Sequence, residues 1–146
     1  MKEITLKITG KQIYSNGDND QSQEEQVQFI TEGKLTTRGD TLVLSYEESE
    51  LSGMPGCITQ MSVTGDVVRM TRKGDGLAEG TEILFEKGKR YSGSFDTPYG
   101  PVKMEVLTTQ VENKLNKDKK GHLAIDYDIS LAGISEGRSR LELEIV

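Results

Sequence analysis

The chain has 146 residues, a formal net charge of -6 and a single cysteine, Cys57. This length favours one domain, 1–146, around one core, and the negative charge argues against nucleic acid or an anionic membrane surface as a partner, because both require a basic face. One cysteine excludes an intrachain disulfide and favours the cytoplasm, and the charged N-terminus "MKEITLKITG" predicts neither a signal peptide nor a membrane span.

Apolar residues recur at every second position in one segment after another, which is typical of β-strands with one buried face. Glycine-containing turns separate the segments, as at Gly39, Gly65, Gly88 and Gly133. The pattern predicts about ten strands and almost no helix. In chain order the apolar rows lie in 4–8, 27–29, 42–46, 57–63, 68–70, 83–85, 91–95, 102–106, 123–131 and 141–145.

One segment, "LTTQVENKLNKDKK", is compatible with two structures. Leu107, Val111 and Leu115 are four residues apart, which is a helical spacing. Its threonine and asparagine residues weaken a helix, and a strand that runs into a charged loop fits equally well.

Short connections between successive strands favour an all-β fold, a single antiparallel up-and-down β-barrel of about 8 to 10 strands, since closure removes exposed sheet edges. A stacked sandwich is the alternative. The interior of a barrel of this size is either filled by side chains or holds one small ligand.

Three stretches, "VVRMTRKGDG", "ILFEKGKRYSGSFDTPYGPVKMEV" and "GHLAIDYDISLAG", resemble in this order the YwiB-like family of small bacterial proteins of unknown function. The resemblance runs from about Asp66 to the C-terminus, and its most specific parts are "RKG", "F..G" and "TPYG". It implies a calycin-like, lipocalin-like barrel. It implies no activity, ligand or catalytic residue.

If consecutive strands are neighbours, their connections alternate between the two ends of the barrel. One end is then mostly acidic, and the other is mostly basic. The acidic end collects 15–24, 48–56, 73–80, 97–101 and 132–137, and the basic end collects 38–40, 65–66, 87–90 and 112–121.

Extending the inner faces of the strands toward the acidic end brings polar side chains to one opening. The residues are Tyr46, Glu48, Arg72, Thr97 and Tyr99. An arginine fork and tyrosine hydroxyls at the end of an apolar interior are typical of a small-molecule site. The alternative is that Glu48 and Arg72 form an ion pair that closes the barrel end without a ligand.

The polar residues near the C-terminus are interpreted as surface residues and not as a functional site. We expect His122 on the outer face with Asp126 and Asp128, and pairing across the turn at Gly133 to set Asp128 opposite Arg140. Too few ligands accompany His122 for a metal site.

Two further expectations concern the inner face. Cys57 lies on the inner parity of its strand, which predicts a buried thiol. In "SFDTPYGPVKMEV", Phe95 and Val102 both point inward, so the hairpin between them needs a loop with an even number of residues.

No GxSxG, HExxH or P-loop motif occurs, so no catalytic residue, metal or cofactor is predicted. The preferred hypothesis is a cytoplasmic barrel that binds a small, partly apolar ligand at the acidic mouth. The alternative is a protein-interaction or self-associating module, such as a homodimer, with a filled barrel and no ligand. An enzyme of unrecognised type is the third hypothesis.

Overall fold

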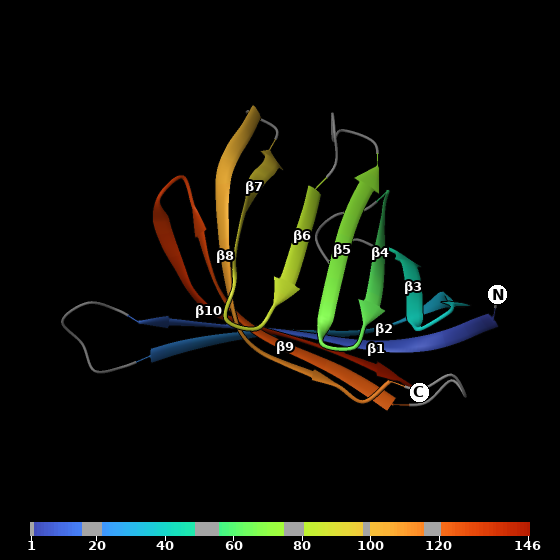
Figure 1. The fold of residues 1–146 in the computed structure, drawn as a ribbon. Coiled ribbons are helices and arrows are strands. Elements are labelled where there is room, and N and C mark those ends of the chain that lie inside the picture. The colour runs from blue at the N-terminus through green and yellow to red at the C-terminus, as the bar shows by residue number, and fades with distance from the viewer. Residues whose placement is uncertain (1, 16–21, 49–55, 75–80, 98–99, 116–120) are drawn as a thin grey trace.

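The computed structural model describes residues 2–15, 22–48, 56–74, 81–97, 100–115 and 121–146, and in these ranges it contains strands and turns only (Figure 1). No described segment is therefore a helix that could cross a membrane. The ten strands are β1 (Lys2–Ser15), β2 (Ser22–Arg38), β3 (Thr41–Glu47), β4 (Cys57–Thr64), β5 (Val67–Gly74), β6 (Thr81–Glu86), β7 (Arg90–Thr97), β8 (Gly100–Asn113), β9 (Gly121–Leu131) and β10 (Ile134–Ile145).

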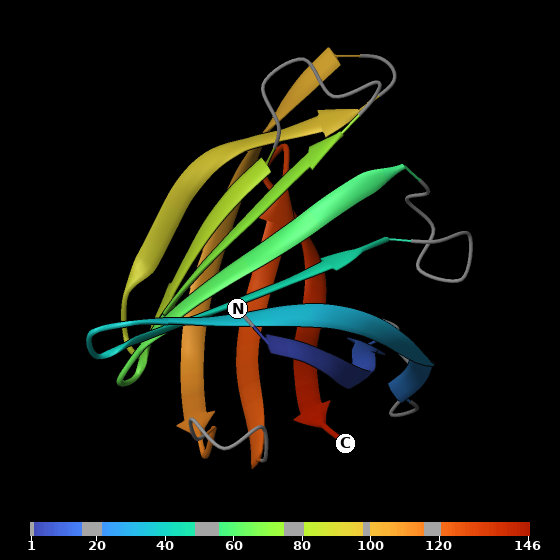
Figure 2. The ribbon, with the colours of Figure 1, turned by 90° about the vertical axis from the view of Figure 1, so that its right-hand side faces the viewer.

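All ten strands belong to one antiparallel sheet with the order β6-β5-β4-β3-β2-β1-β10-β9-β8-β7. Consecutive strands pair with each other except β6 and β7, and β1 also pairs with β10. The edge strands β6 and β7 lie against each other without a hydrogen-bonded ladder, so the barrel is nearly closed (Figure 2). The predicted up-and-down barrel is confirmed, and it agrees with the calycin-like fold that the resemblance implies.

Two hairpins lie where the sequence predicts a turn or a register. Thr64 pairs with Val67, and Gly65 takes the left-handed conformation, with φ of 57°, that a tight turn requires. Phe95 pairs with Val102 and Thr97 with Gly100, so the loop between these strands has the expected even length.

The barrel interior is filled by apolar side chains that lie in cross-strand rows. One row on β3 to β6 contains Leu44, Met61, Met70 and Ile83, all buried. A second row, below it, ends at Phe85, whose ring centroid lies 5.0 Å from that of Tyr127 on the opposite wall. From that wall the core receives Met104, Val106, Leu123, Ile125 and Leu143.

The ambiguous segment after Leu107 is a strand, because β8 continues to Asn113. Its ladder with β9 is irregular between Thr108 and Gln110. Val106 and Thr108 are buried before this β-bulge and Val111 after it, so the inner face changes from even to odd positions. Leu107 therefore lies on the opposite face from Val111, and their spacing of four residues does not mark one buried helical face.

A second irregularity makes one prediction wrong. The register of β9 and β10 shifts between Ser135 and Arg138. Arg140 therefore lies opposite Asp126, and Asp128 lies opposite Arg138. The sequence alone did not reveal this register shift in β10.

Candidate functional site

The centre of the candidate site is a row of polar side chains on the inner face of three neighbouring strands. Tyr46 on β3 lies opposite Thr59 on β4, and Thr59 lies opposite Arg72 on β5. These three residues occupy one level of the barrel, directly above the apolar row that contains Met61. The residue beside Tyr46 on β2 is Gly33, where an added Cβ would lie 2.6 Å from the carbonyl oxygen of Ser45.

Glu48 joins this row from the level above. Its backbone N–H donates to the carbonyl of Cys57 over 2.7 Å, which extends the ladder of β3 and β4 by one residue. The neighbours at this level are small, since Cys57 pairs with Gly74. A Cβ on Gly74 would lie 2.9 Å from the Cys57 sulfur, so the glycine allows the buried thiol to pack here as predicted.

The Glu48 carboxylate is the acceptor that connects the cluster. Its Oε1 accepts the Thr59 hydroxyl at 2.6 Å and Nη2 of Arg72 at 3.3 Å, while Nε of Arg72 donates to Thr59 at 3.1 Å. The Glu48 side chain is 2% exposed and that of Arg72 is 20% exposed. The ion pair proposed as a closure of the barrel end is therefore present.

Burial and charge raise the pKa of the tyrosines around this cluster. The pKa of Tyr46 lies well above its ordinary value, because its hydroxyl is desolvated and because the charge of Glu48 and a hydrogen bond to Glu48 disfavour the phenolate. Desolvation also raises the pKa of Tyr127, although its hydrogen bond with Ser139 and the charge of Arg72 act in the opposite direction. Arg72 therefore acts electrostatically on both walls of the barrel.

We name Tyr46, Glu48, Thr59 and Arg72 the polar cluster. Of the five predicted site residues, Tyr46, Glu48 and Arg72 come together as expected. Thr97 ends β7, and its side chain, like the whole of Tyr99, lies outside the described part of the structure. Thr59 was missed, although it lies on the same inner parity as Cys57 and Met61.

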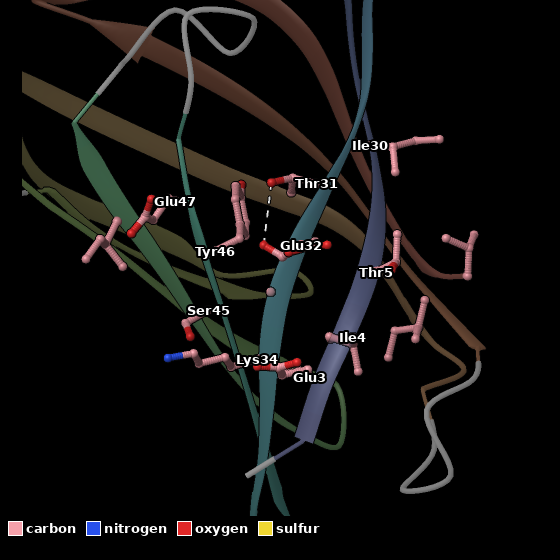
Figure 3. A pocket seen from close by; sticks show the side chains of 14 residues that line it. Glu3, Ile4, Thr5, Ile30, Thr31, Glu32, Lys34, Ser45, Tyr46 and Glu47 are labelled. Carbon is pink, nitrogen blue, oxygen red and sulfur yellow. Dashed lines mark hydrogen bonds between the residues drawn. The ribbon is translucent and has the colours of Figure 1, made fainter.

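Beside the polar cluster lies a surface cavity of about 970 Å³, which we name the corner cavity (Figure 3). It opens where β1, β2 and β3 meet the C-terminus, and the buried Tyr46 is part of its lining. Three exposed apolar side chains also line it, namely Ile30, Ile58 and Val146, which are 65%, 52% and 60% exposed. Its other lining side chains include the carboxylates of Glu3, Glu32 and Glu47 and the ammonium group of Lys34.

A family model described as a domain of unknown function, DUF1934, matches residues 7–143. The chain belongs to the DUF1934 family. The crystal structure of the YwiB protein from Bacillus subtilis has the same fold, with a TM-score of 0.72 and 19% sequence identity over 99% of this chain and 93% of that chain. The resemblance to YwiB-like proteins is therefore confirmed. A search of curated proteins finds no match.

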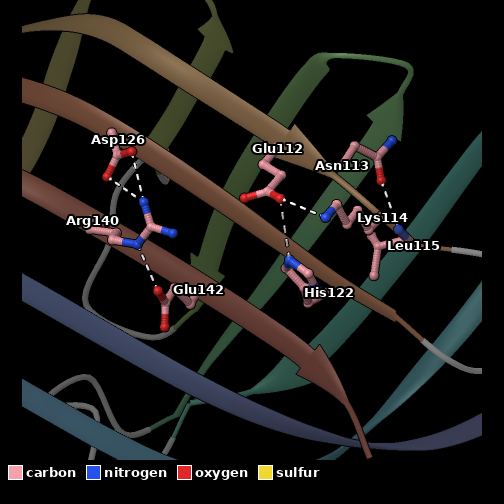
Figure 4. Close-up of polar contacts among 8 residues, drawn as sticks. All are labelled: Glu112, Asn113, Lys114, Leu115, His122, Asp126, Arg140 and Glu142. Atoms are coloured by element: carbon pink, nitrogen blue, oxygen red, sulfur yellow. Dashed lines mark hydrogen bonds and ion pairs between the residues drawn. The ribbon is translucent and has the colours of Figure 1, made fainter.

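The outer face of this DUF1934 protein carries a second, more exposed polar network (Figure 4). Arg140 donates from Nη1 to both carboxylate oxygens of Asp126, at 2.9 and 2.8 Å, and from Nε to Glu142 at 2.6 Å. His122 lies on this face, as predicted, with its Nε2 3.8 Å from the Glu112 carboxylate. Among the described residues, no group of three or more histidine, cysteine or acidic side chains could hold a metal ion.

Proposed function

We propose that this DUF1934 protein binds a small, partly apolar ligand in the corner cavity and not in the interior of its barrel. The proposal rests mainly on Tyr46, because this residue belongs to the polar cluster and also lines the cavity. A rigid, hydrogen-bonded cluster behind a cavity wall is how proteins hold a binding surface in one shape. The cavity volume also lies in the range of ligand pockets, roughly 300 to 1,000 Å³.

The packing of the barrel argues against a ligand in its interior. Met61, Phe85 and Met104 are fully buried, and Met70 is nearly so, in one continuous apolar core. A ligand inside would have to displace these side chains from close packing, at a cost comparable to that of a core mutation. Because the interior below the acidic mouth is filled, we place the proposed site in the corner cavity beside the polar cluster.

The lining of the corner cavity indicates the chemistry of the ligand. Ile30, Ile58 and Val146 offer apolar surface that is now exposed to water, and covering it would stabilise a complex. Three carboxylates and one ammonium group surround this surface. The lining therefore favours a ligand with an apolar body and a cationic or hydrogen-bond-donating end. A contact of the ligand with Thr97 or Tyr99 stays a prediction.

Native mass spectrometry of the protein purified from its own host tests the proposal. We expect a retained small molecule on the wild-type protein and its loss from Ile58→Glu, because the substitution places a charge in the apolar lining. Leu84→Glu is the matched control, since Leu84 is also an exposed apolar residue of a strand but does not line the cavity. Absence of a retained molecule, or equal retention in both variants, would contradict the proposal.

The alternative, a protein-interaction or self-associating module, is favoured by the same filled interior. The exposed side chains Ile30, Ile58 and Val146 would then contact a protein partner. For either function we propose a cytoplasmic location, which is supported by the free, buried thiol of Cys57.

A further inference from the structure

A second, smaller cavity of about 280 Å³ lies on the outer face of the barrel, and we name it the outer pocket. It opens over β1, β2, β9 and β10. Its lining includes Lys7, Thr9, Gln28, His122, Glu142 and Glu144. None of its lining residues belongs to the corner cavity, so a ligand of the outer pocket is separate from the ligand proposed above.

The centre of the outer pocket is a short side chain between longer ones. Thr9 alternates with the inward Ile8, so it lies on the outer face, and yet it is buried. Its cross-strand neighbours are Gln28 on β2 and Glu142 on β10. The Gln28 side chain donates from Nε2 to the Thr9 hydroxyl over 3.1 Å. Thr9 is the acceptor in this bond, so its hydroxyl proton can be donated to a ligand.

Hydrogen-bond donors and acceptors occupy opposite sides of the outer pocket. The side formed by β1 and β2 carries the Lys7 ammonium group, the Thr9 hydroxyl and the Gln28 amide. The side formed by β10 carries the carboxylates of Glu142 and Glu144. Thr9 pairs with Glu142 and Lys7 with Glu144, so the boundary between the two sides runs between β1 and β10. The pocket therefore has a cationic wall and an anionic wall.

One charge on each wall is left without an ion pair by the protein. Glu142 accepts Nε of Arg140 at 2.6 Å (Figure 4). His122, which pairs with Glu144 in the ladder, has its Nε2 3.8 Å from Glu112 instead. In the part of the chain that the structure describes, Lys7 and Glu144 form no ion pair, although they lie directly opposite each other.

We propose that the outer pocket binds a small zwitterion, namely an α-amino acid. Its carboxylate accepts from Lys7 and Thr9, and its ammonium group donates to Glu144. Residues directly opposite on antiparallel strands have Cα atoms roughly 5 Å apart, so one short ligand can reach both groups. Hydrogen bonds to ionised groups are the stronger kind.

The charges and the volume of the outer pocket restrict this class of ligand. A simple anion would face the two carboxylates of β10, and a simple cation would face Lys7. A zwitterion complements both walls. The volume lies just below the roughly 300 Å³ at which typical ligand pockets begin, so an amino acid with a small side chain fits best.

An NMR titration with three probes separates the two charges of the ligand. Glycine carries both charges, acetate carries only the anionic group, and methylammonium carries only the cationic group. We expect glycine to shift the backbone amide signals of Lys7, Thr9, Glu142 and Glu144 and to reach saturation. Acetate and methylammonium should each bind about fivefold more weakly, because each lacks one of two exposed ion pairs.

Two single variants remove the charges one at a time. Lys7→Gln should weaken glycine binding by about fivefold and make it equal to that of methylammonium. Glu144→Gln should have the same effect and make glycine equal to acetate. The matched controls are Lys73→Gln and Glu24→Gln, which change the charge equally at exposed residues outside the pocket. Both controls should bind glycine as the wild-type protein does.

Three results would overturn the outer-pocket site. They are a glycine titration that shifts none of these amide signals, acetate binding as tight as glycine binding, and equal losses in the variants and their controls. Ile58→Glu should leave glycine binding unchanged, because Ile58 lines only the corner cavity. A failed glycine titration together with a molecule retained in the corner cavity would overturn the outer-pocket site alone.

Discussion

Two of the arginines that contact carboxylates lie in contrasting places, Arg72 inside the barrel and Arg140 on its outer face. Arg72 donates to Glu48 and Thr59 at the end of the apolar core, and the Glu48 side chain is 2% exposed. Arg140 makes shorter contacts, with Asp126 and Glu142, but its side chain is 35% exposed. The outer contacts have the better geometry, whereas the inner ones have the greater burial.

The comparison indicates that burial determines how much stability is lost when one partner of an ion pair is removed. Water can solvate Asp126 if its partner is removed, so an exposed pair contributes little. Water cannot reach Glu48 in the same way, so removing Arg72 would leave a buried charge without compensation. We therefore expect the inner arginine to be needed for stability, while the outer one is nearly dispensable.

The largest expected effect is that of Arg72→Ala. Because the substitution leaves the buried Glu48 carboxylate uncompensated, we expect the free energy of unfolding to fall by about 3 to 5 kcal/mol and Tm by about 10 °C. Urea and thermal unfolding measure both. Arg69→Ala is the matched control, since Arg69 lies on the same strand but is exposed on the outer face, where it pairs with Glu82.

A double variant sharpens this test. Replacing both partners by Arg72→Met and Glu48→Leu removes the charges together, and we expect it to restore most of the stability lost in Arg72→Ala. If Arg72→Ala is as stable as Arg69→Ala, the buried pair is not the constraint that its geometry indicates.

An intermediate effect concerns the pH dependence at the polar cluster. The pKa of Tyr46 is raised in the folded protein, so the folded state holds this proton more tightly than the unfolded state does. The contribution of Tyr46 to stability is then constant well below the unfolded tyrosine pKa of about 10, and it falls as the pH rises through and above that value. Tyr46→Phe is expected to reduce that fall in an alkaline urea series.

Phenolate absorbance provides the complementary measurement. The chain has five tyrosines. We expect Tyr46 to ionise only at a pH where the protein unfolds, and the difference between wild type and Tyr46→Phe isolates its signal. Ionisation of Tyr46 in the folded protein near pH of about 10 would contradict its burial beside Glu48.

The smallest effect is expected on the outer face. Arg140→Ala should lower the free energy of unfolding by about 0.2 to 1 kcal/mol at neutral pH, because its partners become solvated. A hydrogen bond from Arg140, followed by the arginine's charge, lowers the pKa of Glu142 against the effect of its partial burial. This stabilisation is present above the unfolded pKa of about 4.3 and is lost as pH falls through the lower folded value.

Urea unfolding at a series of acidic pH values checks this outer effect. The wild-type protein should lose the contribution of Glu142 on acidification, and Arg140→Ala should lose less. Added salt should weaken the wild-type contribution, since the pair is exposed. A loss from Arg140→Ala as large as that from Arg72→Ala would remove the contrast between the two sites.

Local patterns were sufficient to predict much of the barrel. Alternation of apolar and polar residues identified the strands, and the inward positions of Phe95 and Val102 predicted their direct pairing. Continuing the every-second-residue pattern of inward side chains along β3 and β5 correctly predicted that Tyr46, Glu48 and Arg72 lie close together. These predictions succeeded because the side-chain period of a strand is two wherever its ladder is regular.

The predictions failed where that period is interrupted. The irregularity before Arg138 changed the partner of Arg140, and the bulge after Thr108 reversed the inner parity of β8. Thr59 of the polar cluster was missed because the alternation of residues along a strand does not show whether a threonine hydroxyl is buried or exposed. Only its neighbours on β3 and β5 give it a role.

The sequence by itself determined the class of the fold, the order of the strands and the identity of most polar residues at the acidic end, because these depend on periodicity and on chain connectivity. Tertiary structure decided the rest. It determined that the barrel interior is filled, that a cavity opens beside Tyr46, and that β3 pairs with β2 only from Gly33 to Arg38. These features depend on where distant strands meet and separate, and no local pattern along the chain records that geometry.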